Sequence, residues 1–178
     1  HHVALLPRER CAFVSLIRRI RAERPAFRVL DIGASGNPWS VHAGITDYIF
    51  DFRASHHINC FSTEEIETQS AMRCCASTED ACFDKLFTRE RCCRGHEPVV
   101  VGLIDGDVTD ALGEGWTTLL RLVEISGKFD LVITSHLLED LSDPQVVVRQ
   151  LPHIALSGLV AVPSKFSELQ RRATHRGE

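Results

Sequence analysis

The chain has 178 residues, of which 44% are hydrophobic and 25% are charged. This composition is typical of one globular domain with its own core, and two full domains would be cramped in this length. No run approaches the ~18 consecutive apolar residues of a transmembrane helix. The first ten residues also lack the charged-then-apolar pattern of a signal peptide. We therefore expect a soluble, cytoplasmic protein with no membrane association.

The net charge of -4 is unevenly distributed along the chain. Residues 1–30 carry 7 Lys+Arg against 2 Asp+Glu, residues 165–178 carry 4 against 2, and the residues between them carry 9 against 20. The acidic middle of the chain is not expected to neutralise the phosphates of a nucleic acid, which argues against a nucleic-acid partner. The arginines of the first segment are interpreted as a solvated helix face.

Six of the seven cysteines lie between Cys60 and Cys93. An odd number of cysteines without a secretory signal favours reduced thiols or metal ligands over a disulfide framework. One alternative is a zinc site built from single members of a cluster, although no Cys-x-x-Cys pair occurs. The favoured alternative is a set of buried or surface thiols with no metal. The cluster consists of Cys74, Cys75, Cys82, Cys92, Cys93 and His96.

The first third of the chain predicts a helix and two strands. Between Arg8 and Arg24 apolar residues recur at three- and four-residue spacing, which predicts an amphipathic helix closed by Pro25. Residues 27–32 predict a buried strand that runs into a glycine loop at residues 33–38. A second short strand is predicted at residues 47–52.

The rest of the chain alternates strands and helices. Further strands are predicted at residues 99–104, 129–134 and 159–162. One helix between them carries Trp116, Leu119, Leu120 and Val123 on one face and ends at Gly127. The next opens at Asp143-Pro144, carries Val147, Leu151 and Ile154 on its inner face, and has Gly158 as its C-terminal cap.

This alternation predicts a doubly wound α/β fold with a mostly parallel, Rossmann-like sheet of about five strands. The gap between the second and third strands is too long for an ordinary connection, so residues 53–98 are predicted to be a Cys-rich insertion. Residues 1–178 then form one domain: an N-terminal helix (1–25), a core (27–52 and 99–163), the insertion, and a basic C-terminal segment (164–178).

Two acidic residues flank the glycine loop in the sequence. Asp31 precedes the loop, where a carboxylate repels a pyrophosphate and attracts a cationic amino group. Asp51 lies 18 residues after Gly33, close to the ~20-residue offset at which an acid commonly takes ribose hydroxyls. A nicotinamide dehydrogenase is less favoured, because the third glycine of its fingerprint is missing. A plain turn and a surface acid are the simpler alternatives.

With these motifs the chain resembles the class I S-adenosylmethionine-dependent methyltransferases over about residues 27–163, with residues 53–98 unmatched. Four elements agree in order and spacing, and the last is the most specific: phenylalanine-aspartate, an apolar strand, a small residue, histidine and a leucine-glutamate pair. The four elements are Val29–Gly36, Asp51, Gly106-Asp107 and Phe129–Asp140.

The resemblance implies S-adenosylmethionine as cofactor and methyl transfer to an unidentified small molecule, glycan or protein. Asp31 and the glycine loop would hold the methionine part of the cofactor. Asp51 and Phe52 would contact the ribose side, and Asp107 and Val108 would contact the adenine. Ser135 and His136 would line the sulfonium, and His136 is the candidate base, oriented by Glu139 or Asp140. Simpler roles remain open: Asp107 caps a turn, and His136 only packs. The loop residues implied are Gly33, Ala34, Ser35 and Gly36.

The chain also departs from the family pattern. The family's usual sheet has seven strands, and the sequence predicts five, so we expect the C-terminal part of the fold to be missing. An exposed sheet edge would favour association with another chain. The alternative function is therefore a non-catalytic cofactor-binding or partner-binding module derived from such an enzyme.

Overall fold

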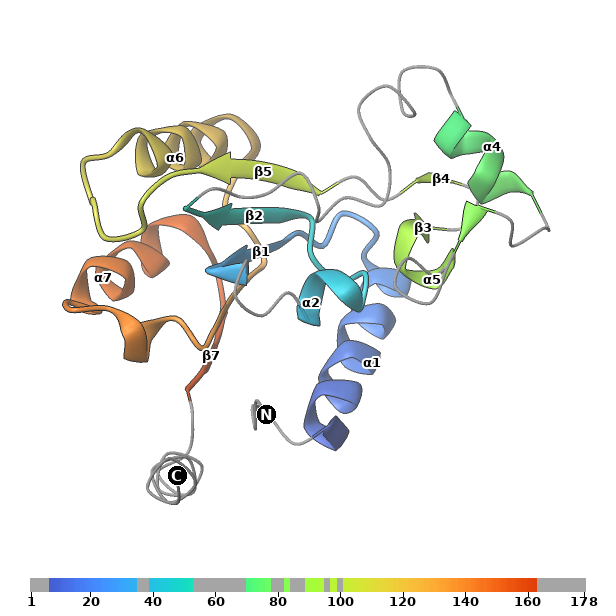
Figure 1. The fold of residues 1–178 in the computed structure, drawn as a ribbon, viewed down its shortest axis with the longest axis horizontal. Coiled ribbons are helices and arrows are strands. Elements are labelled where there is room, and N and C mark those ends of the chain that lie inside the picture. Colours follow the sequence, from blue (N-terminus) through green and yellow to red (C-terminus); the bar gives the residue numbers. More distant parts are fainter. Residues whose placement is uncertain are drawn as a thin grey trace, which may run out of the picture.

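The centre of the structure, a computed structural model, is a five-stranded sheet in the order β5-β2-β1-β6-β7 (Figure 1). The structure describes residues 7–34, 39–52, 70–77, 82–83, 89–94, 97–98 and 101–162. Every pair of neighbouring strands in this sheet is parallel, which confirms the predicted Rossmann-like α/β arrangement. The strands are β1 (Val29–Ile32), β2 (Tyr48–Asp51), β5 (Gly102–Asp105), β6 (Leu131–Ser135) and β7 (Gly158–Ala161).

Helices cover both faces of the sheet. The helices α1 (Pro7–Glu23) and α2 (Trp39–His42) cover one face, where Ile17 and Trp39 pack against Val29. The helices α6 (Glu114–Ser126) and α7 (Gln145–Ile154) cover the other, where the main core contains Trp116 and Ile154. Successive residues of a strand point to opposite faces, so Val29 packs under α1 and Leu30 joins the main core.

The predicted helix ends are partly confirmed. Gly127 follows α6 with φ 81°, and its N–H donates to the carbonyl of Val123, as expected of a glycine cap. Asp143 accepts a hydrogen bond from the backbone of Gln145 at 3.0 Å and so fixes the start of α7. The predicted cap at Gly158 is wrong, because α7 already ends at Ile154 and Gly158 begins β7.

Two of the arginines in α1 anchor the helix to the sheet layer. Arg21 forms an ion pair with Asp47 and donates to the carbonyl of Gly44 at 3.3 Å. Arg18 donates to the carbonyl of Ala43 at 3.0 Å. Arg18 and Arg19 are exposed, as the interpretation of a solvated face predicts, whereas Arg21 is partly buried and departs from it.

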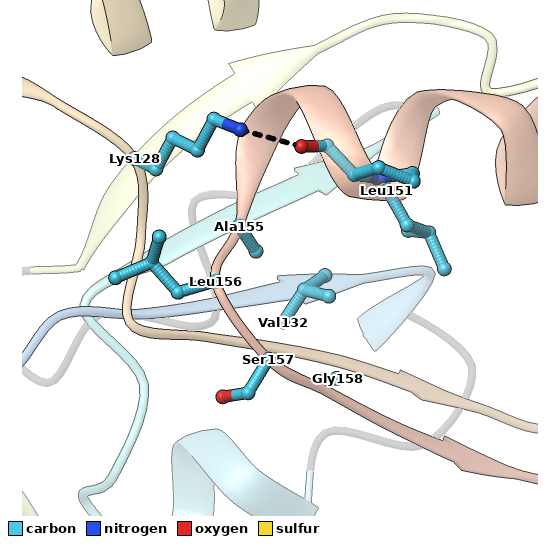
Figure 2. A pocket seen from close by; sticks show the side chains of 8 residues that line it. Lys128, Val132, Leu151, Ala155, Leu156, Ser157 and Gly158 are labelled. Atoms are coloured by element: carbon cyan, nitrogen blue, oxygen red, sulfur yellow. Dashed lines mark hydrogen bonds between the residues drawn. The ribbon is translucent and has the colours of Figure 1, made fainter.

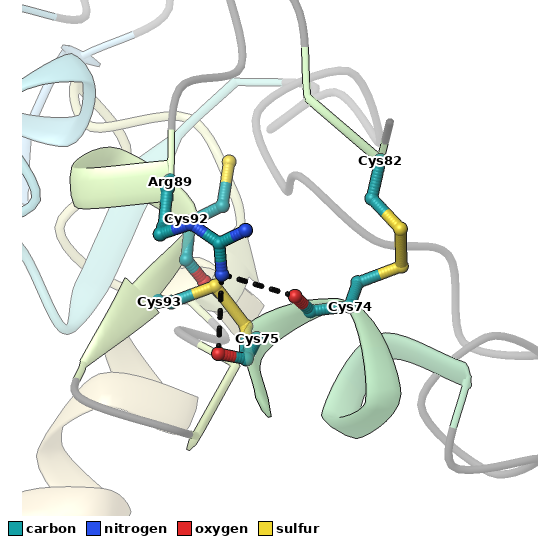
Figure 3. Close-up of a disulfide and its surroundings, with 6 residues drawn as sticks. All are labelled: Cys74, Cys75, Cys82, Arg89, Cys92 and Cys93. Carbon is teal, nitrogen blue, oxygen red and sulfur yellow. Dashed lines mark hydrogen bonds between the residues drawn. A yellow bond between two sulfur atoms is a disulfide. The ribbon is translucent and has the colours of Figure 1, made fainter. Parts of the chain in front are cut away.

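Part of the predicted insertion forms a disulfide-bonded unit (Figure 3). It contains α4 (Ser70–Ala76), α5 (Arg89–Cys92) and a hairpin of β3 (Cys93–Arg94) and β4 (Glu97–Pro98). Cys75, Cys92 and Cys93 are buried and form a separate small core with Ala71. Arg89 donates to the carbonyls of residues 74 and 75, and its guanidinium lies 4.6 Å from the ring of Phe83.

The state of the cysteines differs from the prediction. Cys74 is bonded to Cys82 and Cys75 to Cys93, and Cys92 is also disulfide-bonded. Among the described cysteines only Cys11 is free. The prediction of reduced thiols or a zinc site is therefore wrong for the bonded cysteines, because a sulfur in a disulfide carries no thiolate for a metal. His96, the remaining member of the proposed ligand set, lies outside the described residues.

Among the described strands, β5 forms one edge of the sheet and β7 forms the other. Val160 and Val162 at the β7 edge are 48% and 55% exposed. The predicted association with another chain stays a prediction, as does the division of the chain into a core, an insertion and terminal segments. No helix in the part of the chain that the structure describes is long and apolar enough to cross a membrane.

Gly115 is predicted to tolerate no side chain. A Cβ atom at this position would lie 2.6 Å from Cε2 of Phe50 and 2.7 Å from the Cα of Gly106. The Cα of Gly106 belongs to the backbone, so relieving this contact would require a backbone shift. We expect Gly115→Ala to lower the free energy of unfolding by about 1–3 kcal/mol. Urea unfolding followed by circular dichroism measures this loss. Glu114→Ala, an exposed neighbour, is the control and should change it by less than about 0.5 kcal/mol.

Candidate functional site

The described candidate residues lie where the parallel strands end. Gly33 follows β1, Asp51 ends β2, Asp107 follows β5, and Ser135 ends β6. Because parallel strands have their carboxyl ends at one edge of the sheet, the fold brings these positions to the same edge. β1 and β6 are neighbours, while the chain leaves β1 for β2 on the other side. This is the switch point of a doubly wound sheet, where ligands bind in such folds.

Asp31 is held inside the protein rather than displayed at the edge. It is 1% exposed and accepts a hydrogen bond from the hydroxyl of Ser40, which in turn accepts one from Thr46 at 2.8 Å. Burial raises the pKa of the Asp31 carboxyl to about 7, the Ser40 hydrogen bond lowers it, and the charge of Asp51 raises it further. Near neutral pH this carboxyl therefore exchanges a proton readily, and a neighbouring cation would favour its ionised form.

Gly33 fits the turn after β1 for two reasons. Its φ is +82°, a conformation that side chains rarely adopt, and an added Cβ would lie 2.9 Å from Cδ1 of Leu137. Its N–H donates to the carbonyl of Phe50 at 3.0 Å. Ala34 is buried against Val41 and Ile49. Ser35 and Gly36, the other predicted loop residues, lie outside the described residues.

Asp51 and Phe52 end the second strand side by side. Oδ1 of Asp51 accepts a hydrogen bond from the Phe52 N–H at 2.6 Å. The Phe52 side chain is 59% exposed, which is unusual for a large aromatic side chain. An acidic oxygen and an exposed ring next to each other are suited to a ligand that has both hydroxyl groups and an apolar plane.

The residues after β5 are partly explained by local structure. Asp107 is exposed, and its Oδ1 accepts hydrogen bonds from the N–H and the hydroxyl of Thr109 at 2.8 and 2.7 Å. These bonds lower the pKa of Asp107. The simpler role as a turn cap is thus present in the structure. Val108 is 6% exposed and belongs to the main core, where its carbonyl accepts from Nε1 of Trp116 at 3.1 Å.

His136 has the most unusual backbone of the site. Its φ of 57° is the one positive value found at a non-glycine position among the described residues. Such a conformation costs of order 1–3 kcal/mol and tends to persist at functional sites. Nδ1 lies 3.1 Å from Oε1 of Glu139, at the start of the 3-10 turn Leu138–Asp140. A carboxylate only accepts, so Nδ1 carries the hydrogen and Nε2 is left as the basic nitrogen.

Several polar atoms at the ends of β1 and β6 are buried without a hydrogen-bond partner in the described structure. Buried polar groups are normally paired, because leaving one unpaired costs about 1–3 kcal/mol. Unpaired atoms at one edge of the sheet therefore indicate a place for a polar ligand. The atoms are Oδ1 of Asp31, Oγ1 of Thr134, Oγ of Ser135 and Nε2 of His136.

Sequence reasoning missed four residues near this edge. Ser40 and Thr46 form the hydrogen-bond chain to Asp31. Arg10 lies over the ring of Trp39, at 5.2 Å from its centroid. The Ser40 side chain follows the glycine loop closely and could have been considered, because a hydroxyl beside a buried acid is a common partner. Arg10 and Trp39 are 29 positions apart, and no local pattern signals their contact.

A pocket of about 480 Å³ lies elsewhere, beside the end of α7 (Figure 2). It opens near Val132 and Gly158, at the amino ends of β6 and β7, so it is at the opposite edge from His136. Its one charged group, the Lys128 ammonium, already donates to the carbonyl of Pro152 at 2.7 Å. The lining is otherwise mostly aliphatic and offers no reactive group. The lining residues are Lys128, Val132, Leu151, Pro152, Ala155, Leu156, Ser157 and Gly158.

No group of three or more His, Cys, Asp or Glu side chains within the described ranges is placed to hold a metal ion. His56 and His57, two adjacent histidines of the predicted insertion, lie outside those ranges. The chain matches no protein-family model, no curated protein and no solved structure. The geometry at the carboxyl edge of the sheet is therefore what any functional proposal for this chain must rest on.

Proposed function

We propose that this chain is an S-adenosylmethionine-dependent methyltransferase whose cofactor site is the carboxyl edge of β1, β2, β5 and β6. The observation that carries the proposal is the set of unpaired buried atoms on Asp31, Ser135 and His136 at the switch point. A ligand with a cationic amino group and hydroxyl groups would satisfy them. The spacing of Asp31, Gly33 and Asp51 in the sequence supports the same ligand.

The residues present fit such a cofactor. Oδ1 of Asp31 is free to accept from an ammonium, and an approaching cation would lower the pKa of this carboxyl from about 7 and ionise it. Asp51 would accept from the two ribose hydroxyls, and the exposed ring of Phe52 would cover an apolar face. Bound S-adenosylmethionine supplies an activated methyl group on a sulfonium.

The chain's own residues would position the acceptor and receive its proton. In-line displacement needs the nucleophile aligned with the methyl and sulfur atoms, so much of the rate comes from orientation. Nε2 of His136 would take the proton of a hydroxyl or amine acceptor, while Glu139 holds the Nδ1–H. The acceptor, whether a small molecule, a glycan or a protein side chain, is not specified by these residues.

The cytoplasmic location expected from the sequence stays a prediction. The disulfides of residues 74, 75, 82 and 93 weigh against it, because such bonds persist mainly in oxidising compartments. The disulfide-bonded unit has a core separate from that of the five-stranded sheet, which holds the proposed cofactor site.

The second candidate function is a non-catalytic binding module. The exposed valines at the β7 edge of the described sheet favour it, because exposed strand edges are surfaces for pairing with another chain. The two functions differ in one observable. An enzyme forms S-adenosylhomocysteine in the presence of an acceptor, whereas a module binds the cofactor or a partner chain without turnover.

Asp51→Asn is the first test of the cofactor site. We expect calorimetric titration to show binding of S-adenosylmethionine and S-adenosylhomocysteine, but not NAD, to the unaltered chain. The substitution should weaken both by about 10- to 100-fold, because a hydrogen bond to a charged group contributes about 1.5–3 kcal/mol. The change keeps the size of the side chain and removes its charge and one acceptor.

Asp105→Asn is the matched control. Asp105 pairs with Asp51 in register on the neighbouring strand, so the two substitutions remove the same charge at the same edge. We expect the control to retain nearly full affinity. If both substitutions weaken cofactor binding equally, the effect is a general electrostatic one. If the unaltered chain binds neither S-adenosylmethionine nor S-adenosylhomocysteine, the proposal is contradicted and the non-catalytic binding module is favoured.

A further inference from the structure

Arg10 and Trp39 form a pair of unsatisfied hydrogen-bond donors. Arg10 lies in the first turn of α1, and its guanidinium carbon lies 5.2 Å from the centroid of the Trp39 ring. Nε and Nη2 of Arg10 are buried without a hydrogen-bond partner, and so is Nε1 of Trp39. Trp39 is 9% exposed. Within the described residues, Arg10 takes part in no ion pair.

Arg10 is partly exposed, but leaving its two buried guanidinium N–H groups without an acceptor is costly for a folded protein. Burial lowers the pKa of Arg10 from its ordinary value, which expresses the same cost. The two unpaired nitrogens, Nε and Nη2, are on one edge of the guanidinium and can donate two parallel hydrogen bonds to a carboxylate. The Nε1–H of Trp39, whose ring the guanidinium covers, is a third unpaired donor.

Trp39, with Arg10 over its ring, lies on the same side of the sheet as Asp31, which has an unpaired carboxyl oxygen. Trp39 packs in one cluster with Val29, Leu131 and Ile133, beneath α1 and α2. Side chains alternate along a strand, so Asp31 and Ser135, two positions beyond Val29 and Ile133, lie on this same face of the sheet. An acceptor for an ammonium, at Asp31, and donors for a carboxylate, at Trp39 and the Arg10 over its ring, therefore lie on one side of the sheet.

We propose that Arg10 and Trp39 form a carboxylate-binding site. Two sources of the carboxylate share this chemistry: the amino-acid part of a ligand whose ammonium lies at Asp31, and a separate carboxylate-bearing molecule. The first source rests on the proposed function, and the second does not. The site itself depends only on the unpaired donors.

The first arm of the test measures the site with a simple carboxylate. Malonate is titrated into the full chain at constant ionic strength, with chloride as the replaced anion, and thermal unfolding is recorded. Malonate at a few times its Kd should raise the Tm of the unaltered chain by about 2–4 °C. Arg10→Gln should abolish this rise. Arg19→Gln, which removes an exposed arginine of the same helix, should preserve it.

The second arm identifies the source by calorimetry. S-adenosylhomocysteine carries the amino-acid carboxylate, whereas 5′-methylthioadenosine has the nucleoside and the thioether without it. Arg10→Gln should weaken S-adenosylhomocysteine about 10- to 100-fold and leave 5′-methylthioadenosine unchanged. Arg10→Lys keeps the charge and loses the two parallel donors, so it should recover only part of the affinity. Circular dichroism confirms that each variant is folded.

The outcomes separate the site from the proposed function. Malonate stabilisation that depends on Arg10, with no S-adenosylhomocysteine binding to any chain, supports the site and contradicts the methyltransferase. If malonate stabilisation depends on Arg10 but the affinity for S-adenosylhomocysteine is unchanged by Arg10→Gln, the site is supported and its carboxylate belongs to a separate molecule. A loss of S-adenosylhomocysteine affinity specific to Arg10 supports the first source, whatever malonate does. Indifference of both probes to Arg10→Gln overturns the proposal.

Discussion

Trp116→Ala is expected to lower the free energy of unfolding by about 3–5 kcal/mol, the range for removing a large buried aromatic side chain. Trp116 is 1% exposed and packs edge-on against Phe50, with ring centroids 4.8 Å apart. Its indole N–H donates to the carbonyl of Val108 at 3.1 Å. The substitution therefore leaves a cavity in the main core and an unpaired buried carbonyl.

Urea unfolding followed by far-ultraviolet circular dichroism measures the effect. Leu112→Ala is the control, because Leu112 is 95% exposed, and its change should stay within about 0.5 kcal/mol. Trp116→Phe retains an aromatic ring and loses the hydrogen bond, so it should cost less than the alanine variant. A loss below about 1 kcal/mol for Trp116→Ala would show that this part of the core does not pack as described.

Asp31→Asn is expected to stabilise the protein, and the gain should grow with pH. The pKa of an aspartate is about 3.9 in an unfolded chain, whereas burial raises that of Asp31 to about 7 in the folded protein. Between these two pH values the unfolded chain has released its proton and the folded chain still holds it. The free energy of unfolding of the unaltered protein therefore falls as pH rises from about 4 to 7.

A pKa difference of about three pH units corresponds to about 4 kcal/mol. The asparagine variant does not titrate, so its advantage should be near zero at pH 4 and of order 4 kcal/mol at pH 8. Urea unfolding of both proteins at several pH values measures the difference directly. Asp105→Asn, at an exposed position, should show no such growth. A difference between Asp31→Asn and the unaltered protein that is constant with pH would mean that Asp31 titrates normally.

The sheet was largely predictable because its strands are continuous apolar segments. Side chains on both faces of the sheet are buried, such as Ile32 on one face and Ile133 on the other, and such strands can be recognised without knowledge of their partners. Gly158 was misassigned because a glycine after a helix and a glycine at the start of a strand look alike in sequence. Its place in β7 shows in its pairing with Val132 of β6, a contact 26 positions away in the sequence.

The candidate site was predictable only where a residue follows a strand. Asp51 and Ser135 could be placed by their position in the strand pattern, and the fold brings them to one edge. The Ser40 hydrogen bond to Asp31 and the position of Arg10 over Trp39 depend on how α1 and α2 pack on the sheet. The oxidation state of the cysteines was inferred from their odd number and the lack of a secretory signal, and neither carries information about the geometry that pairs Cys75 with Cys93.

The place of β1 in the sheet has a consequence for synthesis of the chain. The backbone of Arg28, just before β1, donates to Asp130, just before β6, across 102 residues of sequence. At about 5–20 residues per second, β6 is made roughly 5–20 seconds after β1. During that interval one edge of β1 has no strand to pair with, and its backbone groups are open to other chains. Nascent or truncated chains that end before β6 are therefore the forms of this protein most prone to aggregate.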